Sequence, residues 1–310
     1  MVTSVRGADG APPQRDGVGA SRVAMPAAGW DTIVEFLADR FPAIPAPEWA
    51  ARMQRGEVID QTGCAVPPQA RFRPHAMLFY YRSVVDEAPI PFEETVLFQD
   101  AHIVVADKPH FLPVTPSGGY LQETLLVRLR RRLGIEQLAP VHRIDRDTAG
   151  LVLFCIDPAA RDRYQGLFRE HKVTKSYEAI AGWRDDLLLP LVRRSRLIES
   201  KAFMQMCEIS GAPNAETTIS MLERHGPLAR YRLQPLTGQK HQLRVHMAAL
   251  GIPICNDRLY PVLQAAHSAQ SPADYRNPLQ LLARTLAFYD PITGAARHFD
   301  SDRSLDFPAD

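Results

Sequence analysis

The stretch APVHRIDRDTAGLVLF, residues 139–154, joins a dense polar segment directly to an apolar run that is typical of a buried strand. Ordinary turns are built from Gly, Asn and Pro rather than from arginines alternating with aspartates. Charges at such a place are costly unless they are paired. The stretch therefore predicts a functional site held at the edge of a rigid sheet. Its polar side chains are His142, Arg143, Asp145, Arg146 and Asp147.

Length and composition limit what the protein can be. The chain has 310 residues, of which 45% are apolar and 23% charged, as in a soluble globular protein of one or two domains. The net charge of +1 argues against a simple nucleic-acid coat protein, so any nucleic-acid contact must rely on local patches. The four cysteines form no C-x-x-C pair, which disfavours zinc-ribbon and disulfide frameworks. We expect reduced thiols, no metal, no membrane span or signal peptide, and a cytoplasmic location.

Composition shifts divide the chain into four parts. Residues 1–29, rich in Gly, Ala and Pro, predict a disordered tail. Residues 30–82 predict a small unit of two helices followed by a hairpin. Residues 83–95 are acidic, contain prolines and predict a linker. Residues 96–310 form the remaining, larger domain.

Strands outnumber helices in the larger domain, and their order is not a clean β-α-β alternation. This pattern predicts an α+β fold around a mixed, mainly antiparallel sheet with flanking helices. We expect residues 183–215 to be irregular. The predicted helices are 122–133, 157–170 and 239–250, and the predicted strands are 96–98, 103–106, 151–156, 175–182, 215–224, 229–236 and 286–289.

Asp145 is the central carboxylate of the polar segment. It could be a nucleophile or a base kept ionised by nearby arginines. It could also be a turn residue paired with Arg143 or Arg146, and residue types alone favour this second interpretation. Asp147 is the weaker catalytic candidate, because it stands beside Thr148 and could stabilise the turn.

Two further segments contain candidate site residues. Tyr177, in the alternating stretch KSYEAIAG (175–182), is either a packing residue or a flat platform for a base. In LTGQKHQLRVH (236–246), the start of a helix leaves backbone N–H groups unpaired, and Lys240, His241 and Arg244 add donors. A plain basic helix start on the surface would look the same. His241 and His246 are not four residues apart, which argues against a zinc site.

Together, these three segments match a known family in order and spacing. The polar stretch HRIDRDTAGLVLF, the strand KSYEAIAG and the helix TGQKHQLRVHMAALGIPI resemble those of the RluA family of RNA pseudouridine synthases. The resemblance covers about 96–294, including the DKP turn at 107–109 and LAFYDPITG at 286–294. The chain departs from the family at 238–240, where Gly-Gln-Lys replaces Gly-Arg-Thr, and at 282–283, where Leu-Ala replaces His-Ala.

The resemblance implies the pseudouridine synthase fold, with a central RNA-binding cleft, and a cofactor-free enzyme that isomerises uridine in rRNA or tRNA. Asp145 would attack the ribose at carbon 1′ or the uracil ring, or would remove the 2′ proton to give a glycal. Tyr177 would stack on uracil, and Arg244 would keep Asp145 ionised. Leu243 would line the pocket, and Arg143 would fill the gap left by a flipped nucleotide. Further RNA contacts are expected from His142, Arg146, Lys175, Lys240 and His241, in a protein that we expect to be a monomer.

The small unit at 30–82 resembles a degenerate S-four-like RNA-binding module. The matching residues are Arg52, the run Arg-Gly-Glu-Val at 55–58, and the turn at Gly63. This resemblance implies a second RNA contact. A helix-hairpin appendage with no role in RNA binding is equally consistent with the residues.

Two alternative functions fit parts of the sequence. A catalytically silent RNA-binding or ribosome-assembly protein could share the fold, but it would be free to lose Asp145, Tyr177 and Arg244. A glycosidase using Asp145 and Asp147 is disfavoured, because its carboxylates must face each other across the bond that breaks. Neighbouring residues on an extended turn point apart.

Overall fold

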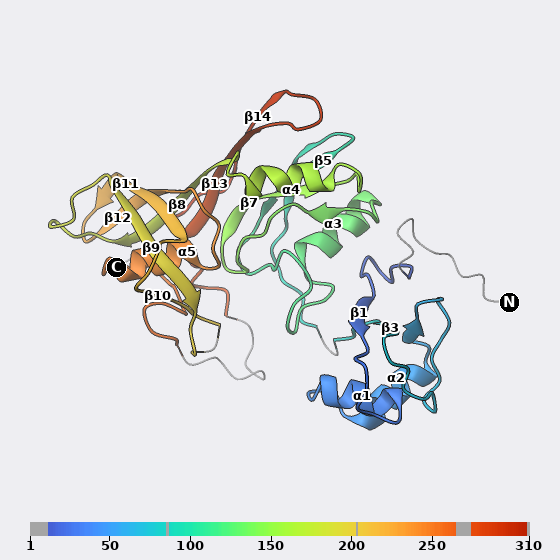
Figure 1. The fold of residues 1–310 in the computed structure, drawn as a ribbon. Helices are drawn as coiled ribbons and strands as arrows, with labels where there is room; N and C mark the ends of the chain where they lie inside the picture. The colour runs from blue at the N-terminus through green and yellow to red at the C-terminus, as the bar shows by residue number, and fades with distance from the viewer. Residues whose placement is uncertain (1–11, 85–86, 203, 265–273, 309–310) are drawn as a thin grey trace. The chain divides into compact units, whose positions relative to one another are not determined.

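The computed structural model describes residues 12–84, 87–202, 204–264 and 274–308 (Figure 1). The chain forms two compact units. The first contains residues 1–88, 116–122 and 127–136, and the second contains 89–115, 123–126 and 137–310. The first boundary falls within the predicted linker, but we had expected 116–136 to belong wholly to the larger domain. Contacts between residues distant in sequence, such as Arg130 Nη1 donating to Gly17 O at 3.0 Å, explain this difference.

The first unit has the helix–helix–hairpin order that the sequence predicts. Helices α1 (Ile33–Arg40) and α2 (Ala46–Gln54) precede strands β2 (Val58–Asp60) and β3 (Met77–Tyr80), which pair antiparallel. Thr32 and Glu35 form a capping box at the start of α1, which satisfies backbone N–H groups there. The side chains of Phe36, Leu37, Trp49 and Leu78 form much of the buried core.

The prediction of a disordered tail over 1–29 is wrong for strand β1 (Ser21–Ala24). This strand pairs antiparallel with β3, and Val23 and Met25 are buried in the core of the first unit. Four residues are too few to show a convincing alternation, so the strand is defined by its partner rather than by its own sequence. Residues 1–11 lie outside the described part of the chain.

The second unit is built on an 11-stranded sheet with the order β10-β9-β11-β12-β8-β13-β7-β5-β4, with β14 paired to β13 and β6 paired to β7. All of these pairs are antiparallel except β13 with β7, so the predicted α+β fold with a mixed, mainly antiparallel sheet is confirmed. The strands are β4 (Thr95–Gln99), β5 (Ile103–Lys108), β6 (Ala139–Pro140), β7 (Ala149–Cys155), β8 (Thr174–Gly182), β9 (Leu191–Glu199), β10 (Met206–Ile209), β11 (Ala215–His225), β12 (Leu228–Pro235), β13 (Leu281–Tyr289) and β14 (Ala296–Asp300).

Three further helices complete the described structure: α3 (Leu125–Leu133), α4 (Arg161–Arg169) and α5 (Gln242–Ala249). Leu243 and Met247 of α5 pack in an apolar cluster with Tyr231 of β12, whereas Tyr164 of α4 packs with Leu153 of β7. The expectation that 183–215 is irregular is wrong, because it contains β9 and β10. Arginines occupy both faces of β9, so hydrophobic alternation is absent and the strand depends on its pairing with β11.

Gly150 lies where the two halves of this sheet join. It pairs with Lys108 of β5 on one side and, in parallel, with Ala283 of β13 on the other. Its φ of +108° favours glycine, and a Cβ atom there would lie 2.3 Å from the carbonyl oxygen of Ala283. Glycine therefore permits the close approach of β7 and β13, immediately after the polar stretch.

Candidate active site

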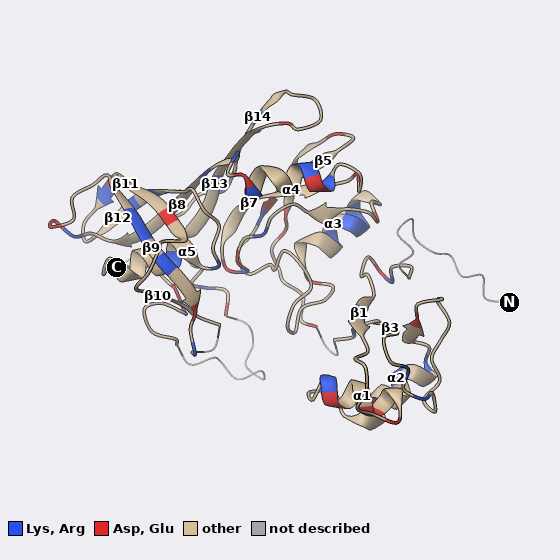
Figure 2. Ribbon diagram, in the orientation of Figure 1, with Lys and Arg blue, Asp and Glu red and all other residues tan. Residues whose placement is uncertain are grey.

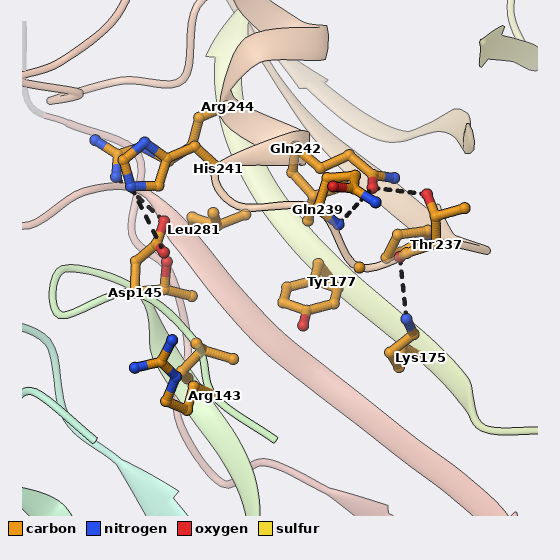
Figure 3. A pocket seen from close by; sticks show the side chains of 15 residues that line it. Arg143, Asp145, Lys175, Tyr177, Thr237, Gln239, His241, Gln242, Arg244 and Leu281 are labelled. Atoms are coloured by element: carbon orange, nitrogen blue, oxygen red, sulfur yellow. Dashed lines mark hydrogen bonds and ion pairs between the residues drawn. The ribbon is translucent and has the colours of Figure 1, made fainter. Parts of the chain in front are cut away.

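A pocket opens beside this junction and collects residues from distant parts of the chain (Figure 3). Its 15 lining residues come from the loop before β7, from β8, from the end of β12, the connection that follows it and the first turn of α5, and from β13. The empty volume is about 510 Å³, which includes space open to solvent. Seven predicted site residues line it: Arg143, Asp145, Lys175, Tyr177, His241, Leu243 and Arg244.

Lys108 anchors the loop that carries Asp145. Its side chain is fully buried, and Nζ donates hydrogen bonds to the carbonyl oxygens of Pro109 and Arg146, both at 2.9 Å. Burial lowers the pKa of Lys108 to about 7, although the charges of Asp147 and Asp145 oppose this shift. The sequence predicted a turn at 107–109 but no role for Lys108. The available signal was a lysine at the end of an apolar strand.

His110 fixes the next part of the same loop. Its Nδ1 lies 2.7 Å from the carbonyl oxygen of Asp147, so Nδ1 must carry the ring proton and donate it. Burial lowers the pKa of His110 to about 4, which keeps the ring neutral near pH 7. The N–H of Thr148 donates to the carbonyl oxygen of Asp145 at 3.2 Å. With Lys108, these bonds satisfy the backbone carbonyls of residues 145–147 and make the loop rigid.

Asp145 and Asp257 share one buried arginine. Arg244 donates from Nη1 to Asp145 Oδ2 at 3.2 Å, and from Nε and Nη2 to the two carboxylate oxygens of Asp257 at 2.8 and 2.7 Å. The side chains of Arg244 and Asp257 are 2% and 1% exposed, whereas that of Asp145 is 29% exposed. Burial opposes the charge of Arg244, but the bidentate pair with Asp257 raises its pKa above the usual value. Asp257 was not among the residues predicted from the sequence.

The pairing of Asp145 with Arg244 differs from the pairing with Arg143 or Arg146 that a turn residue would make. Arg146 pairs with Asp147 at 3.0 Å. Although burial opposes ionisation of Asp147, Arg146 holds the pKa of that carboxyl below its usual value. Arg143 forms no ion pair within the described residues, and it lines the pocket on the side of Asp145 (Figure 3). Asp147 is therefore the turn aspartate, and Asp145 is the carboxylate exposed to the pocket.

Tyr177 projects from β8 into the pocket, across from Asp145 (Figure 3). Burial, reinforced by the charge of Asp145, raises its pKa well above the usual range, so the phenol stays protonated at neutral pH. Within the described residues, its hydroxyl group has no hydrogen-bond partner. The apolar side chains of Leu243 and Leu281 also line the pocket, which therefore suits a flat ligand with polar edges.

Lys175 lies at the other end of the pocket. Its Nζ donates to the carbonyl oxygen of Thr237 at 3.1 Å, and burial lowers its pKa. No carboxylate among the described residues pairs with it. The turn that Lys175 contacts is held by Gln242, whose Oε1 accepts from Thr237 Oγ1 at 2.7 Å and from the N–H of Gln239 at 3.1 Å. Lys175 is thus a positive charge at the rim of a rigid pocket, available to an anionic ligand.

Three residues predicted to contact substrate do not line the pocket. The half-buried His142 ring stacks on Phe168 at 4.6 Å, and its Nε2 accepts the N–H of Leu153 at 3.1 Å. Burial lowers its pKa to about 3, so the ring is neutral and supports β7 rather than binding an anion. Arg146 pairs with Asp147, as described above. Lys240 Nζ lies 3.5 Å from Glu199 Oε1, and both of these side chains are exposed to solvent.

Metal sites and membrane-spanning helices are both absent from the described residues. They contain no group of three or more His, Cys, Asp or Glu side chains that could hold a metal ion. None of the described helices is long and apolar enough to cross a membrane.

Comparison with known proteins identifies the class to which this fold and site belong. Residues 102–249 match the family model described as RNA pseudouridylate synthase. The solved structure of human RNA pseudouridylate synthase domain containing 4 is 27% identical, covers 68% of this chain and 88% of its own, and superimposes with a TM-score of 0.51. The protein is thus an isomerase that acts on RNA.

Curated relatives define the family more closely. The dual-specificity RNA pseudouridine synthase RluA of Pasteurella multocida is 34% identical over 66% of this chain and 90% of its own length. The mitochondrial tRNA pseudouridine(32) synthase of Saccharomyces cerevisiae is also 34% identical, over 53% of this chain and 36% of its own. The chain belongs to the RluA family of RNA pseudouridine synthases.

Proposed function

We propose that this protein converts specific uridines of rRNA or tRNA to pseudouridine and that Asp145 is its catalytic group. The observation that carries the proposal is the placement of Asp145. It is the one carboxylate among the residues that line the pocket, it is held by buried Arg244 at 3.2 Å, and it faces Tyr177. The names of the relatives support this range of substrates, since one is a dual-specificity enzyme and another acts on tRNA.

The reaction needs no cofactor, because it is an isomerisation. The bond between N1 of uracil and carbon 1′ of ribose breaks, a bond from carbon 5 to carbon 1′ forms, and the proton lost from carbon 5 is balanced by one gained at N1. The target nucleotide must leave its stack to reach Asp145. Asp145 then either attacks carbon 1′ or the ring, or removes the 2′ proton. Each route breaks the bond from N1 to carbon 1′ so that the uracil can rotate, and in the route through ring attack the uracil stays bonded to Asp145 while it does so.

Tyr177 would hold that detached ring flat. Its aromatic face suits stacking, and its protonated hydroxyl can donate to a uracil oxygen. The raised pKa supports stacking and hydrogen bonding over a role as a base at neutral pH. Leu243 and Leu281 would exclude water from the ring while it turns.

Local cations would bind the RNA backbone, since the net charge is only +1. Figure 2 shows acidic and basic residues interspersed along the ribbon, with basic segments on α3 and β9. Beside the pocket, Arg143 would fill the gap left by the flipped uridine, and Lys175 would bind a neighbouring phosphate. Arg146 and Lys240 would act at the periphery. We also propose that the protein works as a cytoplasmic monomer without a metal.

The small first unit would contribute RNA contacts through different arginines from those that carry its resemblance. Arg52 pairs with Glu48 at 3.0 Å, and Arg55 pairs with Glu57 at 2.7 Å, so both charges are neutralised within the unit. By contrast, Arg22, Arg71 and Arg73 are exposed and form no ion pair with other described residues. These three arginines are the better candidates for phosphate contacts.

A tritium-release assay tests the proposal. RNA carrying tritium at carbon 5 of uracil should lose label to water with the wild-type protein. Asp145→Asn should abolish release but leave RNA affinity within about tenfold, because neutralising one carboxylate removes no phosphate contact. Asp147→Asn is the matched control and should retain turnover. Binding of rRNA or tRNA by the wild type without any release would favour a silent RNA-binding protein. Mapping pseudouridines in cells with and without the gene would then identify the target uridines.

A further inference from the structure

His241 has an unusual backbone conformation at the edge of the pocket. It lies just before the first residue of α5 with φ of +54°, a left-handed conformation that side chains other than glycine adopt at a cost of roughly 1–2 kcal/mol. Its side chain is only 7% exposed. Such strain persists where the surroundings impose it, often at functional sites. In this protein, the left-handed backbone at His241 places the imidazole ring between Tyr260 and Asp145.

Tyr260 selects the tautomer of that ring. The N–H of Met206 donates to Tyr260 Oη at 2.7 Å, and Oη lies 2.9 Å from His241 Nδ1. With Oη accepting from Met206, the hydroxyl hydrogen is directed to Nδ1, and the remaining proton of the neutral ring must be on Nε2. The opposite tautomer would leave the buried hydroxyl hydrogen without an acceptor and would turn a lone pair of Nε2 towards a carboxylate.

The Nε2 atom faces the catalytic carboxylate. It lies 3.8 Å from Oδ1 of Asp145, while Arg244 holds the other oxygen, Oδ2, at 3.2 Å. We propose that His241, held in one tautomer by Tyr260, is a positioning residue that donates from Nε2–H to Oδ1 and so fixes the orientation of the Asp145 carboxylate. Hydrogen bonds that are long in a free enzyme commonly shorten in the complex with substrate. This role replaces the RNA contact that the sequence analysis predicted for His241.

The electrostatic surroundings agree with a neutral donor. Burial lowers the pKa of His241, while the charge of Asp145 opposes the shift and those of Arg244 and Lys240 reinforce it. A neutral ring lets Asp145 keep its negative charge for chemistry. A second cation beside Arg244 would instead stabilise the carboxylate too strongly to react.

Two substitutions at His241 distinguish the loss of the Nε2–H donor from the loss of the side-chain volume. Gln places its amide nitrogen near the position of Nε2, whereas Asn places it near that of Nδ1 and tolerates the left-handed conformation. We expect His241→Asn to slow single-turnover release of tritium by about tenfold to a hundredfold, as for a lost hydrogen bond to a charged group. His241→Gln should lie within about fivefold of wild type, and both should bind RNA with unchanged affinity.

Nitrogen NMR of the free protein tests the contact without turnover, which matters because the catalytic consequence rests on the proposed function of Asp145. With ¹⁵N-labelled histidine, His241 should appear as the tautomer protonated at Nε2, and Tyr260→Phe should shift it towards a mixture. A ring protonated at Nδ1 in the wild type would overturn the proposal. Equal rates for the Asn and Gln variants would also overturn it, as would loss of RNA affinity with intact single-turnover chemistry. If wild-type protein releases no tritium, the proposed function fails, and the NMR result still decides the contact.

Discussion

Removing the charge of Arg244 should lower both the folding stability and the catalytic rate, and a second substitution should restore only the stability. In Arg244→Met, the carboxylate of Asp257 is left buried without its bidentate partner. Breaking a buried ion pair on one side typically costs 3–5 kcal/mol of folding free energy. Asp257 still accepts the N–H groups of Leu259 and Tyr260 at 2.8 and 3.1 Å. We therefore expect a loss near the lower end, about 3 kcal/mol.

The double variant Arg244→Met, Asp257→Asn removes both charges while keeping an oxygen for the two backbone donors. It should recover about 2 kcal/mol relative to the single variant, since no uncompensated charge remains buried. Asp145 lacks its partner at 3.2 Å in both variants. Both should therefore lose at least a hundredfold in single-turnover release of tritium.

Urea unfolding followed by circular dichroism measures the stabilities, and tritium release measures the chemistry on the same preparations. Asp257→Asn alone is the control for the substitution at that position. A single variant less than about 1 kcal/mol below wild type would mean that the buried pair contributes little. A double variant that regains turnover together with stability would refute the catalytic role of Arg244 and leave it a purely structural residue.

Three further predictions follow from the fold, from burial and from surface charge. Gly150→Ala should destabilise the protein by more than about 3 kcal/mol in urea unfolding, because of its positive φ and the 2.3 Å approach to Ala283. Gly182→Ala, where the added methyl group meets nothing within 4 Å, should change little; similar losses for both would contradict the close packing. His110, whose pKa of about 4 lies below its unfolded value near 6.5, contributes stability that is full above pH 6.5 and is lost as the pH falls towards 4, by about 3 kcal/mol at most. His110→Asn should flatten this part of the stability profile, and an unchanged acid limb would argue against a neutral buried ring. Arg71→Gln with Arg73→Gln should weaken RNA binding and reduce the slope of log affinity against log salt by about 1.4–1.8, whereas Arg55→Gln should not. Equal slopes would remove the first unit from the RNA interface.

The sequence predicted the pocket residues whose signal is local. Asp145, Tyr177 and Arg244 each stand in a dense or regular pattern, and their order along the chain carries the family resemblance. Lys108, His110 and Asp257 were missed as site residues. Their roles depend on contacts to residues 38, 37 and 13 positions away, respectively, and isolated charged residues carry no sign of such partners.

The same distinction explains the errors in the fold. Strand β1 has too few residues to show a period, and β9 is polar on both faces, so neither is recognisable before its partner is known. His142 stands in a charged run of the sequence, but its ring stacks on Phe168 and its Nε2 accepts the N–H of Leu153 in β7. The local motifs predicted which segments come together. The pairing between strands determined which of their side chains reach the pocket.

The register of the central strands also sets the width of the catalytic centre. Gly150 of β7 pairs with Ala283 of β13, and Ala283 pairs in turn with Tyr177 of β8. Neighbouring strands lie about 4.8 Å apart, so the backbones at Gly150 and Tyr177 are separated by roughly 10 Å. Asp145 belongs to the segment that leads into β7, on one side of this span, and the ring of Tyr177 belongs to β8, on the other. The backbone hydrogen bonds among the three strands thus set the width of the gap in which a flat base would lie, independently of the side chains around it.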